Sequence, residues 1–142
     1  MVAGLYGKFE HTMDDKGRVS LPAKFRKELP ERVIVVPGMR GELNVFSEED
    51  FKAWEQSLYA ADGGFCQTNE MHSRTASFLH AHACNVDIDS AGRINVIPDL
   101  RKLAQLDKQI YVTGDGDHVS LWNKDVWESY KADFGFADLW TS

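Results

Sequence analysis

The segment Asp14-Asp15-Lys16-Gly17-Arg18-Val19-Ser20-Leu21 returns 75 positions later as Asp89-Ser90-Ala91-Gly92-Arg93-Ile94-Asn95-Val96. Both copies read Asp-x-x-Gly-Arg and continue with the apolar–polar alternation that is typical of a strand. Another arginine, Arg26 or Arg101, stands eight positions after the arginine of each motif. Self-similarity at a fixed spacing indicates one structural unit used twice. The chain is therefore expected to hold two related units that pair in a two-fold manner.

The two copies stay parallel beyond the motif. Each unit is predicted to run strand, Gly turn, strand, short helix, strand, turn, strand, helix. Pro22 and Pro98 open the short helices, where the missing N–H of proline loses no hydrogen bond. Period-two alternation and β-branched residues predict the later strands at 33–36, 42–46, 110–113 and 118–122.

A longer helix is predicted to end each unit. Ser47 and Asn123 are suitable N-cap residues. Apolar residues then recur at i, i+3 and i+7, a stripe that is most often core packing. The two stripes are Phe51, Trp54, Leu58 and Trp127, Tyr130, Phe134.

Size and composition favour a folded, strand-rich α+β protein. The 142 residues are 43% hydrophobic and 11% aromatic, enough for one ordinary domain or two half-size units that share a core. We expect an N-terminal unit at 5–58, a helical connector at 59–84, a C-terminal unit at 85–134 and an apolar tail at 135–142. The connector has a Gly63-Gly64 turn and a predicted helix over 71–83.

Several features favour a cytoplasmic protein. No apolar run approaches the roughly 18 residues of a membrane span, and the first residues lack the apolar stretch of a secretory signal. The two cysteines, Cys66 and Cys84, cannot form a disulfide framework, which suits a reducing compartment. No membrane association is expected.

The net charge of −6 is unusual for a nucleic-acid-binding protein, but the charge is unevenly distributed. Window 14–27 holds five Lys or Arg against two Asp, and the matching window 89–102 holds three against two. The first motif is therefore the more basic of the two.

The residues of the motif suit a base-reading turn. Gly17 and Gly92 can adopt positive φ, and Asp14 and Asp89 can accept bonds from turn amides and hold the motif arginine. A guanidinium held in this way can donate two hydrogen bonds to guanine O6 and N7 in the major groove. The expected DNA-binding residues are Asp14, Lys16, Gly17, Arg18, Lys24, Arg26, Lys27, Asp89, Gly92, Arg93 and Arg101.

Within that set the roles differ. Lys16, Lys24, Arg26 and Lys27 would contact phosphates, which set the register of a protein on DNA without reading sequence. Local charge favours Arg18 over Arg93 as the reader, and Arg93 either braces the fold or binds more weakly. The plainer alternative is that both Asp–Arg pairs only brace a hairpin, as most surface ion pairs do little else.

The order Asp-x-x-Gly-Arg, alternating strand, Pro, short helix resembles the swapped-hairpin units of AbrB-type DNA-binding proteins. Two such units, with Asp14-x-x-x-Arg18 and Asp89-x-x-x-Arg93, resemble the MraZ family of bacterial transcriptional regulators. Leu21-Pro22-Ala23-Lys24, 87–93 and 114–122 add to this resemblance, which covers about 5–130. An acidic turn at 115–117 and the apolar stretch 134–140 depart from the family pattern.

The resemblance implies fold, partners and location. Two tandem swapped-hairpin units would form an intrachain pseudo-dimeric barrel with flanking helices. Chains of this family assemble into rings, so a ring-like homo-oligomer, of octamer size, is expected. Double-stranded DNA is the expected partner, through short repeats upstream of the division and cell-wall gene cluster, with the protein at the nucleoid. No cofactor and no catalytic activity are expected.

The sequence allows three other interpretations. His80, His82 and Cys84 alternate beside Asp87, as Zn ligands can, but a helix end there would point them to different faces. Asp115, Asp117 and His118, or Asp87 with Asp89, could serve a metal-dependent hydrolase, although no P-loop or dinucleotide fingerprint is present. The nearer alternative is an antitoxin-like protein that masks another protein with its apolar stretch 134–140.

Overall fold

The computed structural model describes residues 2–134 and shows a mixed α/β, strand-rich protein, as predicted. Its larger sheet is antiparallel, with the strand order β1-β7-β8-β4-β3-β5, and β2 and β6 form a separate two-stranded ladder. The strands are β1 (Leu5–Thr12), β2 (Arg18–Ser20), β3 (Arg32–Pro37), β4 (Leu43–Phe46), β5 (Cys84–Asp87), β6 (Arg93–Asn95), β7 (Gln109–Gly116) and β8 (Val119–Asn123). The helices are α1 (Ala23–Arg26), α2 (Glu48–Ser57), the 3₁₀ turn η1 (Ala60–Asp62), α3 (Glu70–His82), α4 (Pro98–Leu103) and α5 (Lys124–Phe134).

The two halves of the chain exchange their first strands. β1 pairs with β7, placing Phe9 opposite Val112, and β5 pairs with β3, placing Val86 opposite Val33. Strands β1, β3 and β4 of the first half correspond to β5, β7 and β8 of the second. Replacing each strand by its counterpart therefore reverses the strand order of the sheet. Because each half completes the sheet of the other, neither half holds its full set of strand partners alone.

Corresponding residues meet at the centre of both sheets. Asn44 of β4 is paired with Ser120 of β8, and the Ser120 hydroxyl lies 3.0 Å from Asn44 Oδ1 as a donor. In the short ladder Val19 of β2 is paired with Ile94 of β6. These two pairs mark an internal two-fold pseudo-axis that runs from one side of the molecule to the other.

The larger sheet does not close into the barrel that the family resemblance implied. β1 and β5 are its two edges, each with one partner in the sheet. A single bridge between Met13 and Val19 joins the end of β1 to the short ladder. Strands of three residues, such as β2 and β6, are too short to continue the hydrogen-bonding of the sheet around a closed circle.

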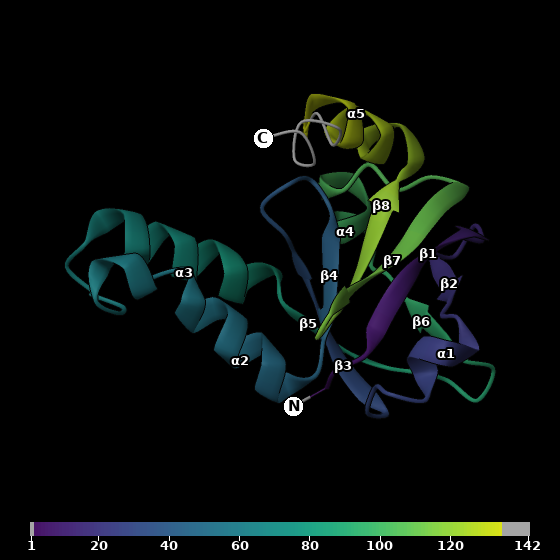
Figure 1. Ribbon diagram of the computed structural model, residues 1–142, viewed down its shortest axis with the longest axis horizontal. Coiled ribbons are helices and arrows are strands. Elements are labelled where there is room, and N and C mark those ends of the chain that lie inside the picture. Colours follow the sequence, from purple (N-terminus) through teal and green to yellow (C-terminus); the bar gives the residue numbers. More distant parts are fainter. Residues whose placement is uncertain (1, 135–142) are drawn as a thin grey trace, which may run out of the picture.

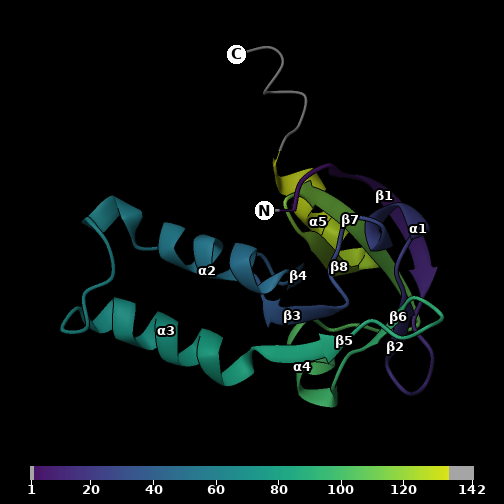
Figure 2. The same ribbon diagram turned by 90° about the horizontal axis from the view of Figure 1, so that it is seen from below.

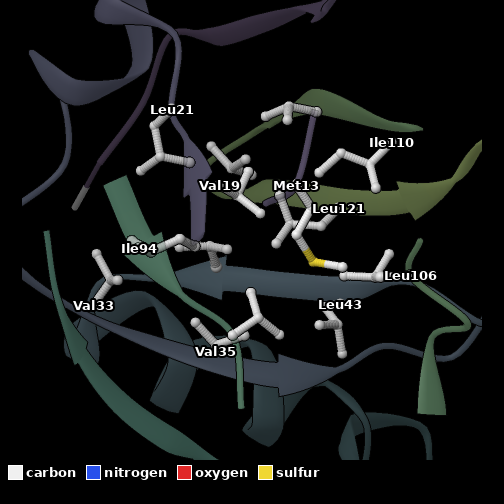
Figure 3. Close-up of a cluster of buried hydrophobic side chains, with 14 of the residues drawn as sticks. Met13, Val19, Leu21, Val33, Val35, Leu43, Ile94, Leu106, Ile110 and Leu121 are labelled. Atoms are coloured by element: carbon white, nitrogen blue, oxygen red, sulfur yellow. The ribbon is translucent and has the colours of Figure 1, made fainter. Parts of the chain in front are cut away.

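The main core lies between the larger sheet and the short ladder. Val33 and Val35 point to this side, together with Val19 and Ile94 from the ladder (Figure 3). Phe25 of α1 is fully buried against the same core. Full burial of an aliphatic side chain contributes about 1.5–3 kcal/mol, so this layer fixes the ladder onto the sheet.

Helices cover the opposite side of the sheet. Ile34, Val36 and Phe46 form a second cluster with α2 and α3, and α5 packs Trp127 onto Trp122 at a ring distance of 5.1 Å. α2 and α3 run side by side and extend away from the sheet, whereas β2, β6 and α1 lie on the other flank (Figures 1 and 2). The short ladder is therefore free of the long helices.

The predicted helix starts are confirmed. Ser47 Oγ accepts a 3.2 Å hydrogen bond from the Asp50 amide at the start of α2, and Asn123 Oδ1 accepts from the amides of Asp125 and Val126 at the start of α5. Phe51 is buried, as predicted for the stripe on α2. The side chain of Phe134 and the predicted apolar tail at 135–142 lie outside the described residues.

Candidate nucleic-acid interface

The first Asp-x-x-Gly-Arg motif forms a tight turn that is organised by Asp14. Asp14 Oδ1 accepts hydrogen bonds from the amides of Lys16 (3.0 Å) and Arg18 (2.9 Å), and Asp14 Oδ2 accepts one from Arg18 Nε at 2.6 Å. Gly17 has a φ of 85°, and its amide donates to the Asp14 carbonyl at 3.0 Å. The aspartate thus fixes both the backbone of the turn and the guanidinium that follows it.

The second motif repeats this geometry bond for bond. Asp89 Oδ1 accepts from the amides of Ala91 and Arg93, both at 2.9 Å, and Asp89 Oδ2 lies 3.1 Å from Arg93 Nε. Gly92 has a φ of 78° and its amide donates to the Asp89 carbonyl at 2.9 Å. Two identical turns therefore follow from the repeated sequence.

Both carboxylates are held in the charged form. Hydrogen bonds from the amide of Arg18 lower the pKa of Asp14, with further lowering by the Arg18 side chain and the Lys16 amide. The amide and side chain of Arg93 lower the pKa of Asp89 in the same way. Each turn accordingly presents an ionised pair at neutral pH.

The guanidinium groups keep donors available for a ligand. In each turn the aspartate accepts a side-chain hydrogen bond only from Nε of the arginine. Within residues 2–134 the terminal nitrogens of Arg18 and Arg93 donate no hydrogen bond. The two side chains are 37% and 36% exposed. A guanidinium that is fixed at Nε and open at its two terminal nitrogens has the geometry for a bidentate contact with a base edge or a phosphate.

The two arginines lie on one face of the short ladder. Val19 and Ile94 point into the core, so the neighbouring side chains of β2 and β6 point to the opposite, outer face. Arg18 and Arg93 are related by the pseudo-axis and stand at diagonal corners of this face. The ladder is thus a two-stranded ribbon that presents one fixed arginine from each half.

Arg26 and Arg101 each lie against the turn of the other half. Arg26 Nη1 is 3.3 Å from the Ala91 carbonyl, and the Arg26 side chain fills the space beside Gly92. The Arg101 guanidinium fills the equivalent space beside Gly17, and its buried Nε has no hydrogen-bond partner in the described part of the chain. Both residues support a turn, and the phosphate contact predicted for Arg26 stays a prediction.

Lys16, Lys24 and Lys27 are exposed, and none forms an ion pair with a described residue. Their charge is therefore not neutralised inside this part of the protein. Lys16 belongs to the first turn, whereas Lys24 and Lys27 flank Arg26, which lies against the second turn. The positive charge of the more basic window 14–27 is therefore divided between the two turns. Lys16 lies beside Arg18, and Lys24 and Lys27 lie on the side of Arg93.

The alternating His80, His82 and Cys84 do not converge. His80 pairs with Glu55 on α2, His82 Nδ1 bonds the Phe78 carbonyl, and Cys84 begins β5. Among residues 2–134 no group of three or more His, Cys, Asp or Glu could hold a metal ion. Both cysteines are free thiols.

Asp115 and His118 belong to a polar cluster on the hairpin between β7 and β8. Asp115 Oδ2 accepts from Ser120 Oγ at 2.5 Å and lies 3.4 Å from Arg40 Nη2. Burial lowers the pKa of His118, but the carboxylates of Asp115 and Asp117 raise it by more, so the net shift is upward. The His118 ring stacks on Phe46 at 4.5 Å. These contacts tie the hairpin to the other half of the chain.

The sequence prediction missed two polar residues of the ladder. Ser20 and Asn95 are exposed and follow the motif arginines by two positions, which places them on the same outer face. The period-two alternation after each motif was the signal that could have identified them.

None of the described helices is long and apolar enough to cross a bilayer.

Comparison with known proteins identifies the family. The family model described as "MraZ protein, putative antitoxin-like" matches residues 5–74 and 78–139. A protein of Thermoanaerobacter sp. (strain X514) is 36% identical over 137 residues, covering 95% of this chain and 93% of its own. A Carboxydothermus hydrogenoformans protein is 36% identical over 124 residues (87% and 84%), and an Acetivibrio thermocellus protein is 35% identical over 128 residues (90% and 87%).

All three relatives bear the name "Transcriptional regulator MraZ". The family match spans both Asp-x-x-Gly-Arg turns and nearly the whole of the described fold. This chain belongs to the MraZ family.

Proposed function

We propose that this chain is a DNA-binding transcriptional regulator that reads sequence through the Arg-bearing turns of its short ladder. The observation that supports this most strongly is the pair of guanidinium groups, each fixed at Nε by an aspartate, with its terminal nitrogens available on a common exposed face. The major groove of B-DNA is wide enough for a two-stranded β-ribbon, and Arg is the commonest reader of guanine O6 and N7.

Local charge answers the objection that the chain is acidic overall. The net charge is −6, but Lys16 in the first turn, and Lys24 and Lys27 beside the second turn, form no ion pair with a described residue. Phosphate contacts from such lysines supply affinity that does not depend on sequence and falls with salt. Arg18 is the principal base reader in this proposal, and Arg93 contributes less.

We also assign the two halves to the swapped-hairpin architecture of AbrB-type proteins. The exchange of β1 onto β7 and of β5 onto β3 supports this assignment. The units are then 5–58 and 85–134, joined by a helical connector at 59–84. An exchange of this kind makes the ladder, and with it the interface, a joint product of both units.

One chain offers too few base contacts for a unique address in a genome, because one bidentate pair discriminates by only about 1–3 kcal/mol. We propose that chains assemble into a ring, of octamer size, and bind tandem repeats upstream of the division and cell-wall gene cluster. Linked sites raise overall affinity by about 10²–10⁴ when their spacing matches. Nucleoid association would follow from this binding.

The test is a titration of the protein with duplex DNA from upstream of its own gene, followed by fluorescence anisotropy at fixed salt. Arg18→Ala should lose binding, because it removes the guanine donors and one positive charge. Arg74→Ala is the matched control, since Arg74 is an exposed arginine on α3 with only an i,i+4 partner, Glu70. Equal affinity of wild type and Arg18→Ala would refute the assignment, and a larger loss in Arg93→Ala would reverse the roles of the two turns.

The ring and the tandem sites need a separate test. Duplexes that carry the same repeats at altered spacing should bind much more weakly than the natural spacing. Unchanged affinity across spacings would reject the match between ring and repeats while leaving the single-site proposal standing.

The description of the family as antitoxin-like favours a second candidate, a protein that binds and masks another protein. Exposed apolar side chains on α3, Met71 and Phe78, would suit a protein partner. The same DNA titration separates the two candidates, since a masking protein needs no sequence-specific DNA binding.

A further inference from the structure

We propose that Ser20 and Asn95 are specificity-determining residues that make the interface read DNA in one orientation. This inference rests on the proposed function, and it concerns the residues that stand beside the two arginines in the ladder.

The register places each polar residue directly across from an arginine. Arg18 is opposite Asn95, and Ser20 is opposite Arg93. Side chains directly opposite each other in an antiparallel pair share one face, with their Cβ atoms about 4.5–5.5 Å apart. Arg18, Ser20, Arg93 and Asn95 therefore form the four corners of the outer face, around the inward-pointing Val19 and Ile94.

Both polar side chains are free to meet a ligand. Ser20 and Asn95 are exposed, and within residues 2–134 neither side chain makes a hydrogen bond. By contrast, Asp14 and Asp89 are committed to their turns, and Arg26 and Arg101 are packed against turn glycines. Ser20 and Asn95 are thus the uncommitted polar groups of β2 and β6, and the fold does not depend on their side chains.

Among the four corners, the two halves differ in chemistry only where the first half has Ser20 and the second has Asn95. Arg18 and Arg93 are equivalent under the pseudo-axis, and so are Ser20 and Asn95. An Asn amide can donate to adenine N7 and accept from N6 in a bidentate contact, whereas a Ser hydroxyl accepts or donates one bond to any base. Because both halves carry an arginine but only one carries an asparagine, the two halves of the interface differ in their reading of adenine.

The spacing determines where the adenine lies. Successive bases rise by about 3.4 Å along a strand, so a side chain about 5 Å from Arg18 reaches the same base pair or the next one. We infer that Asn95 reads an adenine in or next to the base pair contacted by Arg18. At the corresponding position on the other side of the axis, Ser20 tolerates all four base pairs.

An asymmetric reader distinguishes the two directions along DNA. Each chain would bind its site with β2 and β6 in one fixed order along the DNA. Successive chains of an assembly that face the same way would then favour direct repeats over inverted ones. The asymmetry of the preferred site is therefore assigned to the Ser20 and Asn95 pair.

The experiment is a panel of duplexes in which every base pair of the bound site is changed singly, with the affinity of the full chain measured for each. The variants are Asn95→Ser, Ser20→Asn and the double variant that exchanges the two residues. Gln67→Ser, at an exposed position beside α3, is the matched control for the amide-to-hydroxyl change.

Asn95→Ser should lose discrimination at one base pair by about 5- to 150-fold, which corresponds to the 1–3 kcal/mol of one bidentate contact. Ser20→Asn should gain adenine preference at the symmetric position. The exchanged double variant should prefer the site in reverse orientation.

The inference is overturned if wild type binds specifically, Arg18→Ala does not, and all three variants keep the wild-type base profile. That result would leave the proposed function intact. If wild type shows no sequence preference, or Arg18→Ala binds as well as wild type, the proposed function fails and this inference falls with it.

Discussion

Arg26 of the first half lies against Gly92 of the second, with Arg26 Nη1 3.3 Å from the neighbouring Ala91 carbonyl. Arg101 stands in the same relation to Gly17, so each half supports the Asp-x-x-Gly-Arg turn of the other. The contacts are not equal, however. The atoms nearest to a Cβ on Gly92 belong to the Arg26 side chain, whereas the atom nearest to a Cβ on Gly17 is the backbone carbonyl oxygen of Val96, at 2.5 Å.

These contacts predict the effects of three Gly→Ala substitutions. Gly63 also has positive φ, but open space surrounds it, so Gly63→Ala should cost only the left-handed backbone penalty of about 1–2 kcal/mol. Gly92→Ala and Gly17→Ala should both cost more than Gly63→Ala, because Arg26 must move away from Gly92 and the Val96 backbone carbonyl, next to β6, stands against Gly17. Urea unfolding followed by circular dichroism measures the three costs, and a Gly17→Ala cost equal to that of Gly63→Ala would contradict this prediction.

The hydrogen bonds of Asp14 predict a pH dependence of stability. Its pKa is lower in the folded chain than the ordinary 3.8, so its stabilising effect is complete above about pH 4 and is lost as pH falls through the folded value. Asp14→Asn should therefore lower the melting temperature at pH 5–7, and the gap to wild type should shrink below pH 4.

Asp15→Asn is the control for that measurement. Asp15 is an exposed neighbour whose carboxylate has no hydrogen bond among residues 2–134. Its melting temperature should follow wild type across the whole range. A gap for Asp14→Asn that stays constant down to pH 2 would show that the carboxylate charge does not brace the turn.

His118 is predicted to titrate above its ordinary pKa of 6.5. Burial opposes its charge, but Asp115 and Asp117 favour the charged form by more. The folded pKa is raised, so the stabilisation is complete below pH 6.5 and is lost as pH rises through the folded value. An NMR titration of the ring protons gives the pKa directly, and Asp117→Asn, which weakens the 2.7 Å contact with Nδ1, should lower it. A wild-type value at or below 6.5 would be inconsistent with the cluster.

The cap of α2 is predicted to contribute measurable stability. Ser47 Oγ accepts from the Asp50 amide, and Asp50 is itself buried with Oδ2 bonded to the Val2 amide. Ser47→Ala should lower the free energy of unfolding by about 1 kcal/mol, within the range of about 0.5–2 found for such caps. Ser47→Thr keeps both the acceptor and the hydroxyl that donates to Asp50 Oδ2 at 3.1 Å, and it should lose less. Equal losses in both variants would mean that the cap bond is not the source of the stability.

The local structure could be predicted from the sequence where residues specify their own geometry. The Asp-x-x-Gly-Arg motif does so, because the carboxylate, the positive φ and the arginine are all within five positions. Ser47 and Asn123 likewise act on amides two or three residues away. Prediction succeeded at these places because the partners are neighbours in the chain.

Long-range pairing could not be predicted in this way. Nothing in the pattern around Phe9 or Val86 reveals that each strand pairs with the opposite half. The contacts of Arg26 and Arg101 with the turns of the other half depend on that exchange, and so does the ladder that brings Asn95 beside Arg18. The expected pseudo-dimeric barrel is not closed in the structure, because β2 and β6 have three residues each and only the single bridge between Met13 and Val19 joins the ladder to the end of β1.

If the Arg18 turn reads guanine in the major groove, as proposed, a methyl group on guanine N7 will block the contact, and methylation interference measures this. Upstream DNA methylated sparsely at guanine N7 is bound by the protein, and bound and free fractions are compared base by base. Methylation at a few guanines should prevent binding by wild type, whereas methylation elsewhere in the duplex should leave the affinity unchanged. Binding by wild type that is indifferent to methylation at every guanine would contradict the proposal.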